Sequence, residues 1–199
     1  MQGSFEIAKQ SEGLGIPYPP RVDPERNNIG YIDLKHFPQR IDEIYEILGW
    51  PEMRGFLLSL VADTSFFRPL RVDVWKRDTA QGSPFKRYVE SYTTIAFEVL
   101  EINGHVGNFE VLWQRFASSP FIAFCDESTI VEFRAIPTSY NDHGINRSWS
   151  VDVCLVGFGQ DDDEARKQWS CAVNSVSQFL IHESRLNRNE LAKGKPRIS

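Results

Sequence analysis

An amphipathic helix near the C-terminus is the sequence feature that most constrains the fold of this chain. Apolar residues recur at intervals of three and four between positions 165 and 180, which is the spacing of one helix face over about five turns. They are Ala165, Trp169, Ala172, Val173, Val176, Phe179 and Leu180. A stripe of this length has to be buried against another layer, so we expect this helix to be part of the core and Trp169 to lie at its centre.

Four carboxylates, Asp161, Asp162, Asp163 and Glu164, stand immediately before this stripe. Carboxylates in the first turn interact favourably with the helix dipole, which is the structural interpretation of the cluster. Calcium loops space their ligands at alternate positions, so four consecutive acids do not predict a metal site. The other interpretation is that Asp161, Asp162 and Asp163 recognise a basic partner.

The rest of the chain predicts strands and shorter helices. Segments 70–76, 92–102, 129–136 and 149–156 have strand patterns, with further strands expected at 29–34 and 121–125. Helical spacing is found over 37–48, 53–61 and 108–116. The order predicts an α+β fold, a mostly antiparallel sheet of about five to six strands with helices packed on one face and a long C-terminal helix.

The ends of the chain differ in composition from its middle. Eight of the first thirty residues are Gly or Pro, which predicts an extended N-terminal arm over residues 1–30. Residues 31–183 are expected to form a single α+β domain. Residues 184–199 are rich in Lys and Arg and predict a basic, frayed tail. Trp75 lies on the polar face of its strand, and we expect the arm to cover it.

Charge and cysteine content restrict the classes of partner and compartment. The 22 Lys and Arg residues are outnumbered by 27 Asp and Glu residues, which argues against nonspecific nucleic-acid binding. No apolar run approaches the roughly 18 residues of a membrane span, so no membrane partner is expected. The three cysteines, Cys125, Cys154 and Cys171, form no CxxC pair and are odd in number. Free, buried cysteines are typical of a reducing compartment, and we expect a cytoplasmic protein.

Neither a cofactor nor a metal is predicted. Gly157-Phe158-Gly159 lacks the third glycine of a dinucleotide fingerprint, and the aspartates that follow would repel a pyrophosphate. The four histidines are isolated from one another, so none forms a local zinc motif.

The segment 137–148 is the strongest candidate for a functional loop, because hairpin connections are usually shorter. It holds Tyr140, Asp142 and His143, and a His beside an Asp can act as a general base. No nucleophile motif accompanies them. A second long connection, 77–88, would line a groove with this loop if both opened at the same end of the sheet.

Two functions of different classes follow. The first is a non-enzymatic protein-binding domain, an immunity- or inhibitor-like protein that neutralises a basic partner. Its expected binding residues are Tyr140, Asp142, His143, Asp161, Asp162 and Asp163. The alternative is an enzyme or small-molecule sensor with a pocket between the sheet and the C-terminal helix, using His143 and Asp142.

Overall fold

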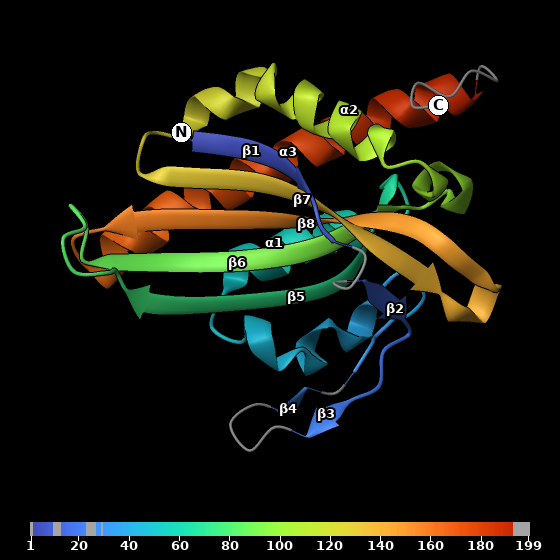
Figure 1. Cartoon of the computed structure of the whole chain (residues 1–199), viewed down its shortest axis with the longest axis horizontal. Coiled ribbons are helices and arrows are strands. Elements are labelled where there is room, and N and C mark those ends of the chain that lie inside the picture. Colours follow the sequence, from blue (N-terminus) through green and yellow to red (C-terminus); the bar gives the residue numbers. More distant parts are fainter. Residues whose placement is uncertain (1, 10–12, 23–26, 29, 193–199) are drawn as a thin grey trace.

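A computed structural model describes residues 2–9, 13–22, 27–28 and 30–192 of the chain (Figure 1). Its centre is a six-stranded sheet with strand order β1-β7-β8-β6-β5, and β2 pairs with β7 beside β1. The four longest strands are antiparallel: β5 (Phe67–Asp78), β6 (Arg87–Phe97), β7 (Thr129–Tyr140) and β8 (Ile145–Gly159). The short strands β1 (Gln2–Ile7) and β2 (Leu14–Ile16) run parallel to β7.

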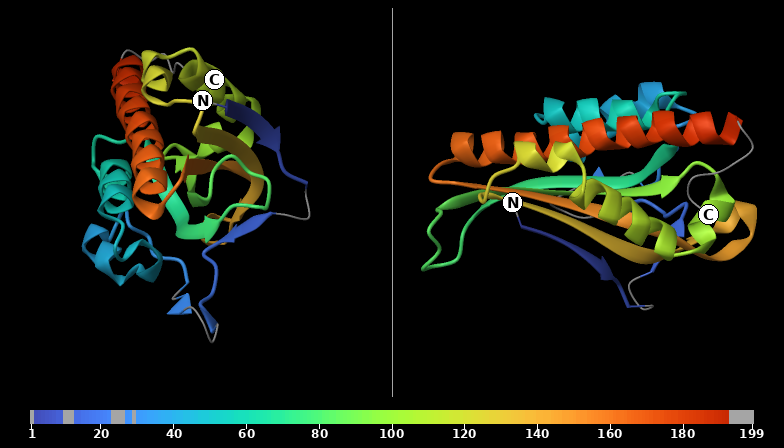
Figure 2. Two further views of the ribbon diagram at one scale, coloured as in Figure 1. Left: turned by 90° about the vertical axis from the view of Figure 1, so that its left-hand side faces the viewer. Right: turned by 90° about the horizontal axis from the view of Figure 1, so that it is seen from above.

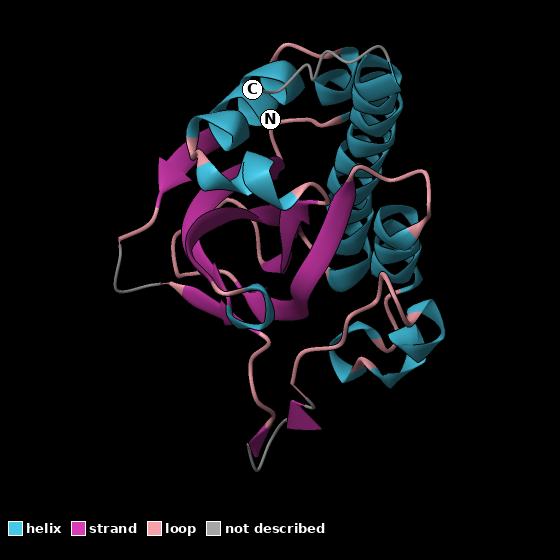
Figure 3. Ribbon diagram, turned by 90° about the vertical axis from the view of Figure 1, so that its right-hand side faces the viewer, coloured by secondary structure: helices cyan, strands magenta, loops and turns pink. Residues whose placement is uncertain are grey.

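The longer helices lie over one face of the strongly curved sheet (Figures 2 and 3). They are α1 (Pro51–Val61), α2 (Gly107–Ala117) and α3 (Asp162–Ala192), and α1 runs beside α3. Short 3-10 helices connect the elements: η2 (Pro38–Glu43), η3 (Tyr45–Ile47), η4 (Leu100–Gly104), η5 (Pro120–Phe124) and η6 (Asn141–His143). A small hairpin, β3 (Arg21–Val22) and β4 (Asn27–Asn28), belongs to the N-terminal arm. The predicted α+β class and the long C-terminal helix are confirmed.

Trp169 lies in the main core, as its place in the apolar stripe predicts. Its side chain is fully buried, its Nε1–H donates to Ser91 Oγ at 2.9 Å, and its ring packs edge-to-face on Trp50. A Cβ on Gly157 of β8 would lie 2.6 Å from both Ala165 O and Trp169 Cα. The missing side chain of Gly157 therefore allows α3 to pack closely on the sheet. Glycine is required at this position for its small size and not only for the backbone freedom that a turn needs.

Three predicted elements are wrong, and in the first of them tertiary packing overrides the local pattern. The apolar run 121–125 is expected as a strand, but Pro120–Phe124 forms η5 and Phe121 packs against Phe179 and His182 of α3. The run 37–48, expected as one helix, is divided into η2 and η3 at Ile44, whose backbone is extended. Residues 30–34 form no strand, and Ile29 lies outside the described residues.

The hairpin between β7 and β8 is tighter than the sequence predicts. Residues 137–140 belong to β7 and 145–148 to β8, so only 141–144 connect them, with Gly144 at a φ of +64°. Pro137 is accommodated within β7 because β1 ends opposite Ala135 and β2 begins opposite Thr138. A residue without an N–H fits this interruption of the neighbouring strand.

The C-terminal helix is also longer than predicted. Residues 184–192 continue α3 and are not a frayed tail. Glu183 is buried and accepts a hydrogen bond from Arg115 Nη1 at 2.9 Å, while Arg188 Nη2 donates to Ser65 O at 2.9 Å. These contacts anchor the end of the helix. Residues 193–199 of the predicted tail lie outside the described residues.

The arm forms a second, smaller core on the sheet face opposite the helices. Ile16 of β2 packs there with Leu70, Ala96 and Tyr140. The ring and hydrogen-bond contacts of Trp75 within the described residues come from β6 and not from the arm: the indole packs edge-to-face on Tyr92 and donates to Glu90 Oε2 at 3.1 Å. All three cysteines are free, and within the described residues no helix combines the length and apolar character needed to cross a bilayer.

Candidate functional site

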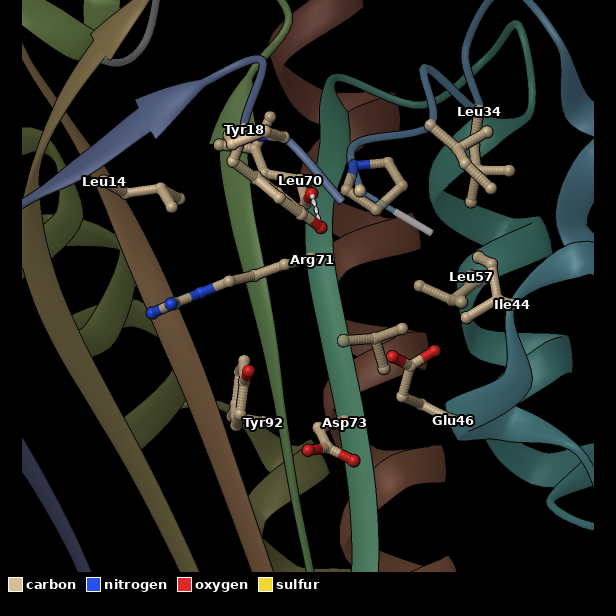
Figure 4. Close-up of a pocket in the computed structure, with 15 residues that line it drawn as sticks. Leu14, Tyr18, Leu34, Ile44, Glu46, Leu57, Leu70, Arg71, Asp73 and Tyr92 are labelled. Carbon is tan, nitrogen blue, oxygen red and sulfur yellow. Dashed lines mark hydrogen bonds between the residues drawn. The ribbon is translucent and has the colours of Figure 1, made fainter. Parts of the chain in front are cut away.

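A cavity of about 260 Å³ lies where the arm meets strand β5 (Figure 4). β5 is the outermost strand of the sheet on this side, and the cavity contacts five consecutive residues of it, 69–73. It extends round the edge of the strand, so both faces of β5 contribute side chains. The other lining residues are Leu14, Tyr18, Pro19, Gly30, Ile32, Leu34, Ile44, Glu46, Leu57 and Tyr92.

The wall on the helix side is apolar. Ile44 and Leu57 come from the η2–η3 segment and α1, and Leu34 comes from the chain that follows the arm. Figure 4 shows these side chains facing β5 across the cavity, with Glu46 of η3 below them. Leu57 and Leu34 are also part of the main core, so this wall is held by packing that exists without a ligand.

The wall on the arm side is polar and aromatic, and Arg71 organises it. Its Nη2 donates to both carboxylate oxygens of Asp152 at 2.9 and 3.3 Å, and its Nε donates to Thr94 Oγ1 at 2.7 Å. The guanidinium carbon lies 4.9 Å from the centre of the Tyr92 ring. Arg71 is therefore a paired, positioned cation that supports Tyr92 from one side.

The two lining tyrosines are neutral donors. Burial raises the pKa of Tyr18 to about 12, with a further rise from Tyr92. Burial likewise raises the pKa of Tyr92 above its ordinary value, opposed by the positive charge of Arg71. Both phenols keep their protons near neutral pH, and Tyr18 donates to the carbonyl oxygen of Leu70 at 3.4 Å. They suit hydrogen bonding to a ligand better than proton abstraction.

The site residues expected from the predicted loop lie at the far tip of the β7–β8 hairpin. Tyr140 is 2% exposed and belongs to the second core, so its ring is not a surface anchor. Asp142 and His143 are exposed and lie in η6. The structure thus brings His143 beside Asp142 on the surface. Neither residue lines the cavity, although their turn lies next to the arm, where Ile16 pairs with Tyr140.

The acidic cluster lies at the other end of β8, where α3 begins (Figure 1). Asp161 Oδ1 accepts the Glu164 N–H at 2.9 Å, and Glu164 Oε2 accepts the Gln160 N–H at 2.6 Å, so these two residues cap the helix. Asp162 pairs with Lys76 at 2.6 Å and with Arg87 at 3.3 Å. Asp163 is exposed.

The predicted residues therefore form two separate groups. The connection 79–86 lies beside the acidic cluster, since Gln160 Nε2 donates to Pro84 O at 2.8 Å, while the turn 141–144 lies at the opposite end of the sheet (Figure 1). The two long connections do not line one groove. A basic partner for the acidic cluster stays a prediction.

The sequence analysis did not identify the cavity. Its lining comes from six separate stretches of chain, and none of them contains a motif. Among the described residues, no three His, Cys, Asp or Glu side chains gather in a way that would hold a metal ion. The one sequence signal was indirect, because the Gly and Pro content of residues 1–30, which includes Pro17, Pro19 and Pro20, predicted an extended arm.

Comparison with known proteins assigns no family to the chain. No protein-family model matches it, and no curated protein or solved structure matches it significantly.

Proposed function

We propose that this chain is a non-enzymatic binding protein and that the cavity beside β5 is its binding site. The observation that carries the proposal is the enclosed space itself, which joins apolar walls to a few convergent polar groups. Concave sites of this composition are the usual location of ligand binding. The occupant is a group that combines apolar surface, for the helix-side wall, with hydrogen-bonding atoms for Tyr18, Tyr92 and the edge of β5.

The state of the polar groups favours binding over catalysis. Arg71 is held by Asp152 and Thr94, and the two lining phenols have raised pKa values. A general base needs a pKa near the working pH, and a nucleophile needs an adjacent base. The arrangement supplies fixed donors and an apolar surface, which are the properties of a recognition site.

The cavity is a better supported site than the acidic cluster. Asp161 already caps α3, and Asp162 is paired with Lys76 and Arg87. The cavity residues, in contrast, surround a space in which a further group fits. That the partner is a basic protein, which this chain neutralises in an immunity- or inhibitor-like role, stays a prediction.

The proposal is tested with a neutral fluorescent probe, N-phenyl-1-naphthylamine, excited beyond the absorption of tryptophan. We expect saturable binding to the parent protein. Ile44→Trp places an indole in the cavity and should weaken probe binding by about tenfold or more, equivalent to about 1.4 kcal/mol. The matched control is Leu58→Trp, because Leu58 is an exposed apolar residue of α1 that does not line the cavity.

Thermal melts of both variants verify that they fold, since overpacking costs about 1–3 kcal/mol. The proposal is refuted if the parent shows no saturable signal. It is also refuted if Leu58→Trp weakens probe binding as much as Ile44→Trp does, because the probe would then be reporting general surface hydrophobicity.

A further inference from the structure

We propose that the occupant of the cavity is an extended polypeptide segment that adds to the outer edge of β5 as a further strand. This inference rests on the proposed function, because it names the class of ligand for the same site. Strand addition to an exposed sheet edge is a general mode of peptide recognition, in which main-chain hydrogen bonds supply affinity and side-chain pockets supply specificity.

The hydrogen-bond phase of β5 determines which of its backbone groups point outward. Just beyond one end of the strand pair Thr79 N–H donates to Lys86 O, and just beyond the other end Glu98 N–H donates to Phe66 O, so the even-numbered residues of β6 bond to β5. In an antiparallel ladder such pairs alternate with non-bonded pairs. Counting back along the register, Arg71, Asp73, Trp75 and Arg77 bond to β6, whereas Val72, Val74 and Lys76 direct their N–H and C=O groups away from the sheet.

Two of the outward groups near the cavity already have side-chain partners. The Leu70 carbonyl, at the irregularity between Pro69 and Arg71, accepts the Tyr18 hydroxyl at 3.4 Å. The Val74 N–H donates to Asp73 Oδ1 at 2.8 Å. Both contacts satisfy positions that would otherwise be open to edge-to-edge pairing.

Val72 lies between these two positions and lines the cavity. Within the part of the chain that the structure describes, its N–H and C=O take part in none of the hydrogen bonds outside the ladder. A backbone donor and acceptor left in a partly enclosed, apolar space are costly unless something pairs with them. Another backbone in extended conformation offers the matching acceptor and donor at the matching spacing.

The two walls of the cavity specify the side chains of such a segment. Val72 packs against the main core, which includes Leu34 and Leu57 on the helix side. Asp73 lies on the arm side with Tyr92 (Figure 4). Successive side chains of a strand point to opposite faces. A segment along this edge therefore places an aliphatic side chain against Ile44 and Leu57, and the residues on either side of it, which are polar, towards Tyr92.

The experiment begins with selection from a phage-displayed library of random dodecapeptides on the parent protein. Binding of the enriched peptide, made synthetically, is then measured by calorimetry. Val72→Pro removes the outward N–H without removing a ladder hydrogen bond, and proline is tolerated at such edge positions. We expect this variant to bind the peptide at least about tenfold more weakly. The matched control is Lys76→Pro, an outward position of the same edge outside the cavity, which should bind as the parent does.

A second measurement does not depend on the folding of a variant. Each amide of the peptide is N-methylated in turn and tested on the parent protein. Strand addition predicts that methylation weakens binding only at alternate residues, because every second N–H points towards β5. Losses without this two-residue period, or equal binding to the parent and Val72→Pro, overturn the proposal.

Failure of this inference is distinguishable from failure of the proposed function. If N-phenyl-1-naphthylamine binds in the Ile44-dependent manner but no peptide is enriched, the cavity is a binding site for small molecules and strand addition is wrong. If the probe does not bind either, the cavity is not a binding site and both proposals are wrong.

Discussion

Trp169 should contribute to the free energy of unfolding through both its volume and its indole N–H. Truncating a buried Trp to Ala costs about 3–5 kcal/mol through lost burial and the cavity left behind. Here Ser91 is also fully buried, and its hydroxyl accepts the indole N–H at 2.9 Å. Leaving that hydroxyl unpartnered adds about 1–3 kcal/mol, so Trp169→Ala should cost at least about 4 kcal/mol.

A double-mutant cycle separates the hydrogen bond from the volume. Trp169→Phe keeps an aromatic ring but removes the N–H, so it should cost more in the parent than in a Ser91→Ala background, where no hydroxyl is left unsatisfied. We expect a coupling of about 0.5–1.5 kcal/mol. Trp75→Phe is the control, because its indole N–H also bonds a side chain, Glu90, but at a half-buried site.

The free energies come from urea denaturation, followed by fluorescence and circular dichroism. The reasoning is refuted if Trp169→Ala costs less than about 1 kcal/mol, which is the size expected at an exposed position. It is also refuted if Trp169→Phe costs the same in both backgrounds, because the bond to Ser91 would then contribute nothing.

Three further predictions follow from the geometry. Gly157→Ala should lower the midpoint of urea unfolding by an amount equivalent to at least about 1–3 kcal/mol, since its Cβ would meet the backbone of α3; an unchanged midpoint would contradict the close approach. Burial raises the pKa of both Tyr18 and Tyr31 to about 12 from 10.0, so absorbance at 295 nm should show them ionising late, together with Tyr92 and Tyr140, whose pKa values burial also raises. Because the unfolded chain loses those protons first, stability should fall between about pH 10 and pH 12, and a flat profile there would exclude the assignment. Asp161→Ala should cost about 0.5–2 kcal/mol in thermal unfolding, whereas Asp161→Asn should be nearly neutral, since Asn caps equally well; equal losses would point to charge and not to capping.

Local periodicity was sufficient to predict the elements that bury one face. The 165–180 stripe is helical because only a period near 3.6 aligns its apolar residues, and Trp169 is buried as expected. Segments 129–136 and 149–156 are strands, as the alternation of apolar and polar residues along each predicts. These patterns act over a few residues, so the α+β class could be predicted from the sequence without knowing which strands are neighbours.

Where a segment packs could not be predicted in this way. The run 121–125 is apolar enough for a strand, yet Phe121 packs on Phe179 of α3 and the segment becomes a 3-10 helix. Tyr140 was expected at a surface because it falls in the predicted loop 137–148, but the arm covers it on the far face of the sheet. Both outcomes depend on contacts with residues far away in the sequence, which a local pattern does not encode.

The candidate site shows most clearly the division between what local sequence patterns predict and what tertiary contacts decide. The sequence by itself determined that residues 17–20 are extended and that 70–76 form a strand. Only the tertiary structure made β5 an edge strand, set the register that turns Val72 outward, and placed Tyr18 on the carbonyl of Leu70. The physical reason is that the sequence pattern of a strand is the same whether one or both of its edges pair with neighbouring strands. The cavity exists because, among the described residues, no strand pairs with the outer edge of β5, and the arm and η3 close around that edge.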